Sequence, residues 1–265
     1  MENGKKTSLF YKIFSLLSVV RGYNILLIVI AQYLASIFIF SPEKSLNNVL
    51  LDVDLYFIVL ATICVIAAGY IINNFYDSET DRINKPLKSK IDGIVSQKIK
   101  LRIYFLLNFI GVCFGFLVSL RASFFFSVYI FLIWFYSHKL KRYPLAGLFS
   151  ATTLAILPFF AVFVHYRNFS EIIFTHAAFL FFILLIRELI KDLESLSGDF
   201  TQNYQTIAVK YGEYFTKILI SIVVVLTLNP IYIECYFVSL REYKFKILWN
   251  LNIKKYILEV LLLPN

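Results

Sequence analysis

Acidic side chains recur at helical spacing in two separate parts of this 265-residue chain. Asn73, Asp77 and Asp81 are four residues apart, so on a helix they would lie along one face. Asp192 and Asp199 are seven residues apart, which corresponds to two helical turns. Mg²⁺ prefers oxygen ligands and usually takes one or two carboxylates together with substrate phosphates. The two segments therefore predict a site for a divalent cation.

Basic residues follow the first acidic segment and recur farther along the chain. The set comprises Arg82, Lys85, Lys88, Lys139, Lys141 and Arg142. Cationic side chains of this kind can neutralise a diphosphate leaving group. Together with the carboxylates, they indicate cleavage of a diphosphate from a lipid.

The composition places these polar segments in a membrane protein. Hydrophobic residues make up 59% of the chain and charged residues 16%, whereas soluble domains are about 45–50% apolar. The net charge of +9 would also fit nucleic-acid binding, but the cations lie in loops between apolar runs. That arrangement indicates membrane orientation and contact with anionic groups, so we expect membrane lipid and no nucleic acid among the partners.

Apolar runs near the ~20 residues that span a bilayer must position the acidic segments. They cover about residues 16–40, 55–75, 103–120, 145–164 and 172–186, with a shorter run at 124–136. A seventh begins near Ile218 and is interrupted at Asn229 and Pro230. We therefore expect an all-α fold, a polytopic transmembrane helical bundle of about seven to eight spans. It would form a single membrane domain over 1–265, in which 229–265 is an atypical or truncated tail.

The distribution of cations predicts how the chain is oriented. If each run crosses once, the N-terminus and the segments 77–102, 138–143 and 191–213 share one side and carry most of the Lys and Arg residues. The opposite side, through residue 171, carries Lys44, Arg121 and Arg167. The positive-inside rule then puts the N-terminus and both acidic segments in the cytoplasm, in the inner membrane if the cell is bacterial.

The first run contains three polar side chains that would be costly in contact with lipid. Arg21 either extends to the cytoplasmic interface or faces a polar cavity. Asn24 lies deeper, which favours the cavity. Gln32 is deeper still, and we expect it to make a hydrogen bond between helices.

Three motifs resemble those of the UbiA superfamily of intramembrane prenyltransferases. Residues 73–86 resemble its Asn-Asp-x-x-Asp-x-x-x-Asp motif and the Asn-Lys-Pro that follows. Residues 134–147 resemble its tyrosine and Leu-Lys-Arg segment. Residues 187–212 resemble its second aspartate-rich motif and the threonine after it. With Arg21 and Asn24, the resemblance covers about residues 15–215.

This resemblance implies an integral-membrane prenyltransferase built around a lipid-accessible cavity. Mg²⁺ would bridge the aspartates and the diphosphate of a polyprenyl donor, and the prenyl group would pass to a small acceptor, either an aromatic ring or a glycerol phosphate, in quinone or lipid biosynthesis. The implied catalytic residues and metal ligands are Asp77, Asp81, Asp192 and Asp199. The implied substrate-binding residues are Asn24, which lines the cavity, Asn73, which orients or ligates, and Lys85, Tyr136 and Lys141, which contact the diphosphate.

The chain departs from the family pattern at three places. Asn74 and Ser195 stand where the two motifs usually have aspartate, and each change removes a negative charge from a metal site. The residues after 212 leave room for about two spans of ~20 residues, where the family has three. These departures motivate an alternative function, a non-catalytic or decayed relative that binds prenyl lipid or metal.

Two further classes fit the sequence less well. A transporter would place its carboxylates near the membrane midplane, whereas these lie at helix ends. A CDP-alcohol phosphotransferase would carry an Asp-Gly-x-x-Ala-Arg signature, which is missing from this sequence.

Overall fold

The protein is a helical bundle with seven helices that are long and apolar enough to cross a membrane. The computed structural model describes residues 9–201 and 204–261, and it contains no strand within those ranges. The candidate spans are Gly22–Phe40, Val53–Tyr76, Gln97–Val118, Leu120–Arg142, Pro144–Tyr166, Glu171–Glu194 and Ile207–Ile233. The expected all-α, multi-pass architecture is therefore confirmed.

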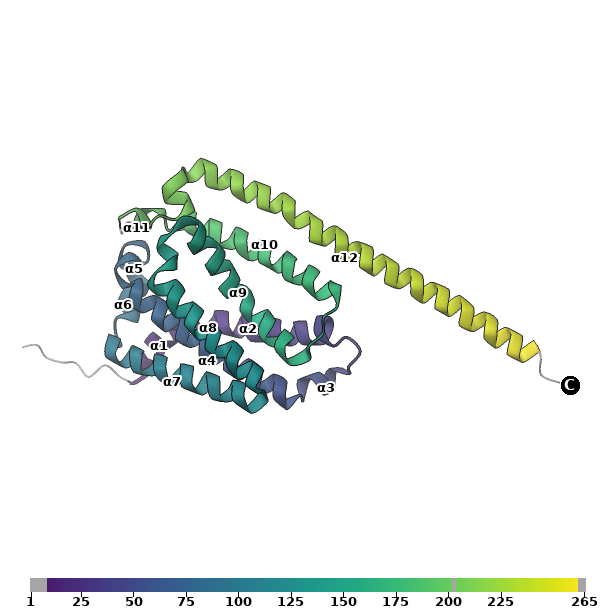
Figure 1. The fold of residues 1–265 in the computed structure, drawn as a ribbon. Helices are drawn as coiled ribbons and strands as arrows, with labels where there is room; N and C mark the ends of the chain where they lie inside the picture. Colours follow the sequence, from purple (N-terminus) through teal and green to yellow (C-terminus); the bar gives the residue numbers. More distant parts are fainter. Residues whose placement is uncertain (1–8, 202–203, 262–265) are drawn as a thin grey trace, which may run out of the picture.

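Short helices connect the long ones at both ends of the bundle (Figure 1). The long helices are α2 (Gly22–Ala35, continued by a π-helical turn at Ser36–Phe40), α4 (Val53–Tyr76), α7 (Gln97–Val118), α8 (Leu120–His138), α9 (Pro144–Tyr166), α10 (Glu171–Glu194) and α12 (Ile207–Leu261). The shorter ones are α1 (Leu9–Val19), α3 (Leu46–Leu50), α5 (Ser78–Asn84), α6 (Pro86–Asp92), a 3₁₀ turn at Leu140–Arg142, and α11 (Leu196–Thr201). Helices α5, α6 and α11 gather at one end, and α3 lies at the other.

Helix α4 lies at the centre of the bundle, where it contacts α2, α7, α8 and α9. Gly111 of α7 permits a close approach to α4, because a Cβ there would lie 2.9 Å from Val65 Cγ2 of α4. Gly115 does the same between α7 and α8, with a Cβ position 3.0 Å from Phe126 Cδ2. Small residues at such crossings allow helices to pack closely in lipid.

A buried polar contact joins three of the long helices. The Gln32 amide of α2 donates hydrogen bonds to Thr62 Oγ1 of α4 at 3.1 Å and to the Pro158 carbonyl of α9 at 2.9 Å. Pro158 lies inside α9. The expected interhelical hydrogen bond of Gln32 is thus confirmed.

The first apolar run is not one helix, as the sequence predicted, but two. Helix α1 ends at Val19, and Arg21 adopts a left-handed conformation with φ 51° and ψ 57° before α2 begins at Gly22. The break falls at Arg21 and Gly22, a polar residue and a glycine that interrupt the apolar residues on either side. As a result α1 lies beside α6, and the first span begins at Gly22.

The expected interruption at Asn229 and Pro230 is also wrong, because α12 continues through Pro230. Transmembrane helices tolerate proline when nearby groups satisfy the freed carbonyl. The backbone of α12 instead departs from helical geometry at Gly212, with φ 85° and ψ 166°. The seventh span therefore begins at Ile207, well before Ile218.

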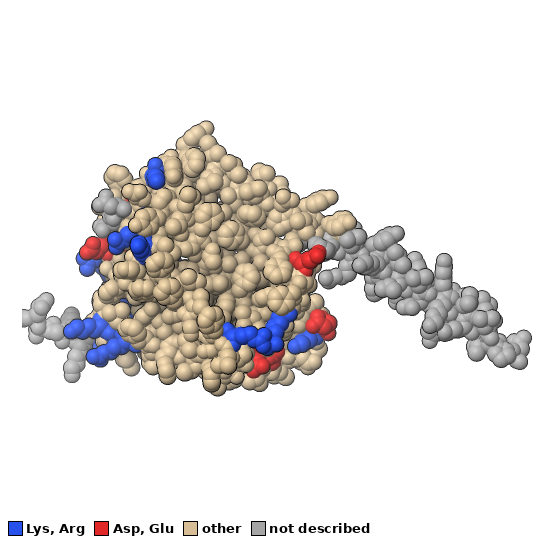
Figure 2. Space-filling view, viewed as in Figure 1, with Lys and Arg blue, Asp and Glu red and all other residues tan. Residues whose placement is uncertain are grey.

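The surface of the bundle is mostly apolar, as contact with lipid requires. In Figure 2, uncharged residues fill most of the visible face, and Lys, Arg, Asp and Glu side chains lie toward its margins. Exposed hydrophobic side chains occur on several helices, including Leu26 on α2, Phe109 on α7 and Phe131 on α8. Patches of this extent on a soluble protein would be unusual.

Candidate active site

The first acidic segment leaves the membrane through a one-residue junction at Asp77. Helix α4 ends at Tyr76 and α5 begins at Ser78, while Asp77 between them has φ −92° and ψ 5°. The Asp77 N–H donates to the Asn73 carbonyl at 2.9 Å, and the Asp81 N–H donates to the Asp77 carbonyl at 2.8 Å. The predicted single helix over these residues is therefore corrected to two, although their four-residue hydrogen-bond spacing is kept.

The second acidic segment uses the same backbone arrangement. Ser195, with φ −95° and ψ 5°, separates α10 from α11. Its N–H donates to the Lys191 carbonyl at 3.0 Å, and the Asp199 N–H donates to the Ser195 carbonyl at 3.0 Å. Each acidic segment is thus a long helix, a single bent residue and a short helix.

Asn84 joins the two acidic segments, because it links α5 to α11. Its side-chain amide donates to the Ser195 carbonyl at 3.3 Å, and its Oδ1 accepts from the Gly198 N–H at 3.0 Å and from Ser197 Oγ at 3.4 Å. Gly198 is required for this approach, since a Cβ there would lie 2.3 Å from Asn84 Nδ2. The structure therefore brings the two predicted segments together.

Two of the predicted site residues, Asp77 and Lys141, form an ion pair in a largely buried setting. Lys141 comes from the 3₁₀ turn after α8, so the predicted basic segment reaches the first acidic segment. The Tyr204 hydroxyl lies 3.5 Å from the same Asp77 oxygen, and its ring lies 5.7 Å from Lys141 Nζ. The loop that carries Tyr204 is fixed by Gln205, whose N–H donates to the Arg142 carbonyl at 3.1 Å.

The carboxylates of the two segments are close enough to influence one another. Burial raises the pKa of Asp81, and the neighbouring Asp77 charge raises it further. Burial likewise raises the pKa of Asp199, with a contribution from Asp77, although Ser195 Oγ donates a hydrogen bond to Asp199 at 2.6 Å. Among the described residues, no three His, Cys, Asp or Glu side chains converge closely enough to hold a metal ion unaided.

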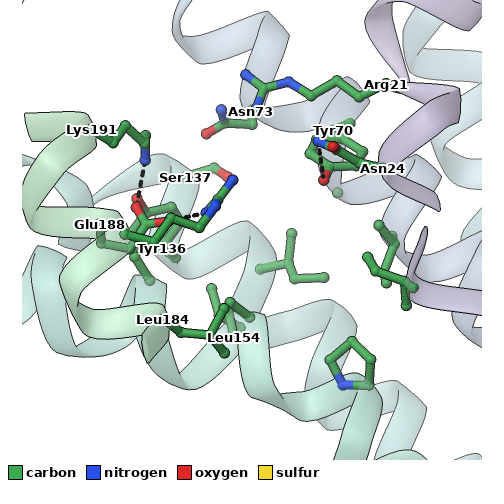
Figure 3. A pocket seen from close by; sticks show the side chains of 18 of the residues that line it. Arg21, Asn24, Tyr70, Asn73, Tyr136, Ser137, Leu154, Leu184, Glu188 and Lys191 are labelled. Carbon is green, nitrogen blue, oxygen red and sulfur yellow. Dashed lines mark hydrogen bonds and ion pairs between the residues drawn. The ribbon is translucent and has the colours of Figure 1, made fainter. Parts of the chain in front are cut away.

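A cavity of about 350 Å³ opens beside this cluster, between α2, α4, α8, α9 and α10. Asn24, Asn73 and Tyr136, all predicted to bind substrate, are among its lining residues. Figure 3 shows Asn73, Arg21 and Lys191 around one part of the space, and Leu154 and Leu184 around another. The Asn24 amide donates to the Tyr70 hydroxyl at 3.4 Å. The cavity therefore has a polar region and apolar walls.

The remaining predicted residues lie around this cavity. Lys85 is exposed and lines an adjoining pocket of about 440 Å³ together with Arg21, Arg187 and Lys191. Its charge partly opposes the rise in the pKa of Asp81. Asp192 lines a small pocket that it shares with Tyr136, Lys141, Glu188 and Thr206.

Sequence reasoning missed several residues of the site. Asn84 and Tyr204 were not among the predicted residues, although Asn84 belongs to the quoted Asn-Lys-Pro. Glu188, which extends the second acidic segment by one turn, was also not among the predicted site residues, yet it is 6% exposed and accepts from Arg187 at 2.6 Å and from Lys191 at 2.7 Å. A carboxylate one turn before Asp192 was the signal that could have identified it.

Comparisons of sequence place the chain among known proteins. A model described as the UbiA prenyltransferase family matches residues 29–243. Digeranylgeranylglyceryl phosphate synthase from Sulfolobus acidocaldarius is 32% identical over 171 residues, which cover 64% of this chain and 62% of that relative. The protein of the same name from Methanobrevibacter smithii is 28% identical over 218 residues, which cover 78% of this chain and 73% of that relative.

Alignments with the relatives from S. acidocaldarius and Sulfurisphaera tokodaii span 62% and 64% of those relatives' own length. Solved structures share the fold. A UbiA homolog from Archaeoglobus fulgidus, bound to DMAPP and Mg²⁺, has a TM-score of 0.67 at 15% identity over 82% of this chain and 76% of that one. A structure of digeranylgeranylglyceryl phosphate synthase has a TM-score of 0.64 at 21% identity over 83% and 76%. From the match over residues 29–243, the chain belongs to the UbiA prenyltransferase family.

Proposed function

We propose that this protein transfers a prenyl group from its diphosphate to a glycerol-phosphate acceptor within the membrane. The observation that carries the proposal is the meeting of two acidic segments and Lys141 beside an apolar cavity. The names of the relatives favour a glycerol phosphate over an aromatic ring as the acceptor.

The acidic residues fit Mg²⁺ by the chemistry of their side chains. Asp77, Asp81, Asp192 and Asp199 offer hard carboxylate oxygens. Burial, together with the charge of Asp77, raises the pKa values of Asp81 and Asp199 and so disfavours their ionised forms, which a bound cation would stabilise. Mg²⁺ needs only one or two carboxylates from each segment when diphosphate oxygens complete its shell. When bound, it would polarise the diphosphate as a Lewis acid and stabilise it as a leaving group.

Lys141, Tyr136 and Lys85 would bind the departing diphosphate. The Lys141 ammonium, which neutralises Asp77, is placed to exchange one anionic partner for another. Tyr136 shares a pocket with Lys141 and can donate through its hydroxyl, while Lys85 is exposed beside Asp81. Donors aimed at the leaving oxygens stabilise the charge that develops as the carbon–oxygen bond breaks.

The walls of the cavity would hold the prenyl chain and keep water from the allylic cation. Leu27, Ile66, Ile133, Leu154 and Leu184 supply apolar contact. Exclusion of water protects reactive intermediates from hydrolysis. Asn24 and Asn73 lie at the polar part of the same space, where the diphosphate end of the donor or the acceptor would be oriented.

We infer that residues 1–265 form one membrane domain, with a family-like core at about 15–215 and an atypical segment at 229–265. We also infer that the end bearing α5, α6 and α11 faces the cytoplasm, because Lys85, Lys88, Lys141 and Arg142 lie there.

The test is an assay of membranes that contain the protein, supplied with geranylgeranyl diphosphate and a prenylated glycerol phosphate. We expect a product joined by one new carbon–oxygen bond, with release of diphosphate, only when Mg²⁺ is present. Asp77→Ala and Asp192→Ala should each lower transfer by about a hundredfold or more. Mass spectrometry of the extracted lipid measures the product.

Asp54→Ala is the matched control, because Asp54 is exposed in the first turn of α4 at the opposite end of the bundle. It should retain full transfer. A correctly inserted protein that converts neither glycerol-phosphate nor aromatic acceptors would contradict the proposal and favour the non-catalytic alternative.

A further inference from the structure

A second group of charged side chains lies fully inside the protein, apart from the cavity and the acidic site. Lys100 of α7 is 2% exposed and Asp92, the last residue of α6, is 3% exposed. Between them lies Asn74 of α4, which is 9% exposed. Buried charges of this kind are stable only when they are paired and hydrogen-bonded.

The Asn74 amide connects the two buried charges. Its Oδ1 accepts from Lys100 Nζ at 2.8 Å, and its Nδ2 donates to Asp92 Oδ2 at 3.1 Å. Asp92 also accepts from Lys88 Nζ at 2.6 Å and from Ser18 Oγ at 2.7 Å. An aspartate at position 74 could accept from Lys100, but as a carboxylate it could not donate to Asp92.

Asn74 and Asp92 enclose the segment that carries half of the proposed site. Asp77, Asp81 and Lys85 all lie between them in the chain, Asp81 on α5 and the other two at its ends. The contact at 3.1 Å therefore ties the two ends of this segment together, while Lys100 and Ser18 attach it to α7 and α1. On its other side the segment is held to α11 by Asn84.

We propose that Asn74, Asp92 and Lys100 are positioning residues that hold the segment 77–85 in the geometry that binds the donor. Asn74 is then not a metal ligand replaced by an amide, as its place in the motif implied, but one part of a buried support. A test by the KM for the prenyl diphosphate rests on the proposed function, whereas a test by the rate of tryptic cleavage does not.

The test is an exchange of the two side chains. Asn74→Asp alone places two carboxylates against each other, and Asp92→Asn alone places two amide groups between two lysines. In Asn74→Asp/Asp92→Asn, Asp at position 74 accepts from Lys100 and from the new amide, so the contact between positions 74 and 92 and the single negative charge of the group are restored. Lys88 loses its carboxylate partner, but its side chain is 29% exposed and can turn to water. We expect each single change to raise the KM for the prenyl diphosphate by about tenfold with a smaller effect on kcat, and the exchange to restore it to within about threefold.

A second measurement needs no turnover. Trypsin should cleave the protein in membranes within residues 78–90 about tenfold faster in each single variant and near the original rate in the exchange variant. Asn168→Asp is the matched control, since Asn168 donates to the Phe40 carbonyl at 3.1 Å at the opposite end of the bundle. It should change neither the KM nor cleavage within residues 78–90.

Two results would overturn the inference. One is an exchange variant no better than the single variants in cleavage rate. The other is an Asn74→Asp protein that needs less Mg²⁺ and turns over faster, which would show that position 74 faces the metal. The original protein could prove inactive while the exchange variant still returns the cleavage rate to its original value. That result would count against the proposed function alone.

Discussion

Asp81 and Asp199 each carry a charge that their surroundings disfavour. Burial raises the pKa of both, and Asp77 adds repulsion to each. An aspartate whose pKa is raised in the folded state stabilises the fold most when it is protonated, so this contribution is present at low pH and is lost as the pH rises through the folded value. A cation bound between the segments would reverse that preference, because it favours the ionised form.

We therefore expect Mg²⁺ to bind more weakly as the pH falls through the raised pKa values of Asp81 and Asp199. Protons and the cation compete for the same oxygens, and the competition should begin above the ordinary aspartate range. The Mg²⁺ concentration for half-maximal transfer, measured at several pH values with saturating donor, should rise by about tenfold for each pH unit below the first of these values. A concentration that stays constant down to about pH 4 would contradict this expectation.

Single residues were predictable where the spacing had one interpretation. Asp77 and Lys141, which the sequence assigns to one site as metal ligand and diphosphate contact, lie together as an ion pair, and Asn24 lines the cavity. Asn74 was not predictable, because its partners Asp92 and Lys100 come from two later helices. A motif gives the type of residue at a position, but the direction of the side chain depends on packing.

At the scale of elements, the two acidic segments depend on close packing of α5 against α11. Asn84 makes three hydrogen bonds across this contact, and each one requires Gly198 or its neighbours to approach closely. Asp77 and Ser195 bend the backbone by the same φ and ψ to within a few degrees of one another, which brings the short helices out of line with the long ones. The separation of the proposed metal ligands is therefore set by packing between two short helices.

Gly198→Ala should separate these helices. The added Cβ would lie 2.3 to 2.5 Å from the Asn84 amide atoms, which their hydrogen bonds hold in place. We expect a loss of about 1–3 kcal/mol in the free energy of unfolding and a larger relative loss of transfer at limiting Mg²⁺. Gly22→Ala is the control, since its Cβ would meet Leu17 Cδ2 at an ordinary 3.7 Å. Equal effects of the two substitutions on Mg²⁺ dependence would show that the α5–α11 contact does not set the site.

The long helices were predictable because spanning hydrocarbon demands a length and a composition that few other structures share. Their breaks were not. The bends at Arg21, Asp77 and Ser195 fall between segments that are helical on both sides. Helix α12 continues through Pro230, where the sequence predicted that the seventh apolar run is interrupted. Such breaks cost little in local hydrogen bonding, so tertiary packing decides where they occur.

At the scale of the whole molecule, the ends of the bundle differ in charge. The end with α5, α6 and α11 carries both acidic segments and the basic residues around them, whereas the other end carries the pair of His165 and Asp52 at 3.1 Å and a Lys44 side chain over Tyr166. The Asp52 pair is local: burial opposes ionisation there, but the Leu55 N–H and His165 lower the pKa of Asp52. The asymmetry predicts the orientation of the protein in its membrane.

Cysteine labelling tests that orientation. Lys90 in α6 and Glu43 before α3 are both exposed and lie on either side of α4. With Cys113 and Cys235 replaced by Ser, a membrane-impermeant maleimide should label Lys90→Cys only from the cytoplasmic side and Glu43→Cys only from the other. Labelling of both from one side would show that α4 does not cross, and reversed labelling would contradict the orientation.

The ion pair between Lys141 and Asp77 would also couple the binding of the metal ion to the binding of the prenyl diphosphate. A metal ion that arrives alone meets a carboxylate already neutralised by an ammonium group. A diphosphate would give Lys141 another anion to bind and would release Asp77 to the metal. Because such coupling is reciprocal in free energy, the donor raises the affinity for the cation by the same factor as the cation raises the affinity for the donor. The two would therefore bind cooperatively, and neither would leave an uncompensated charge within the apolar bundle.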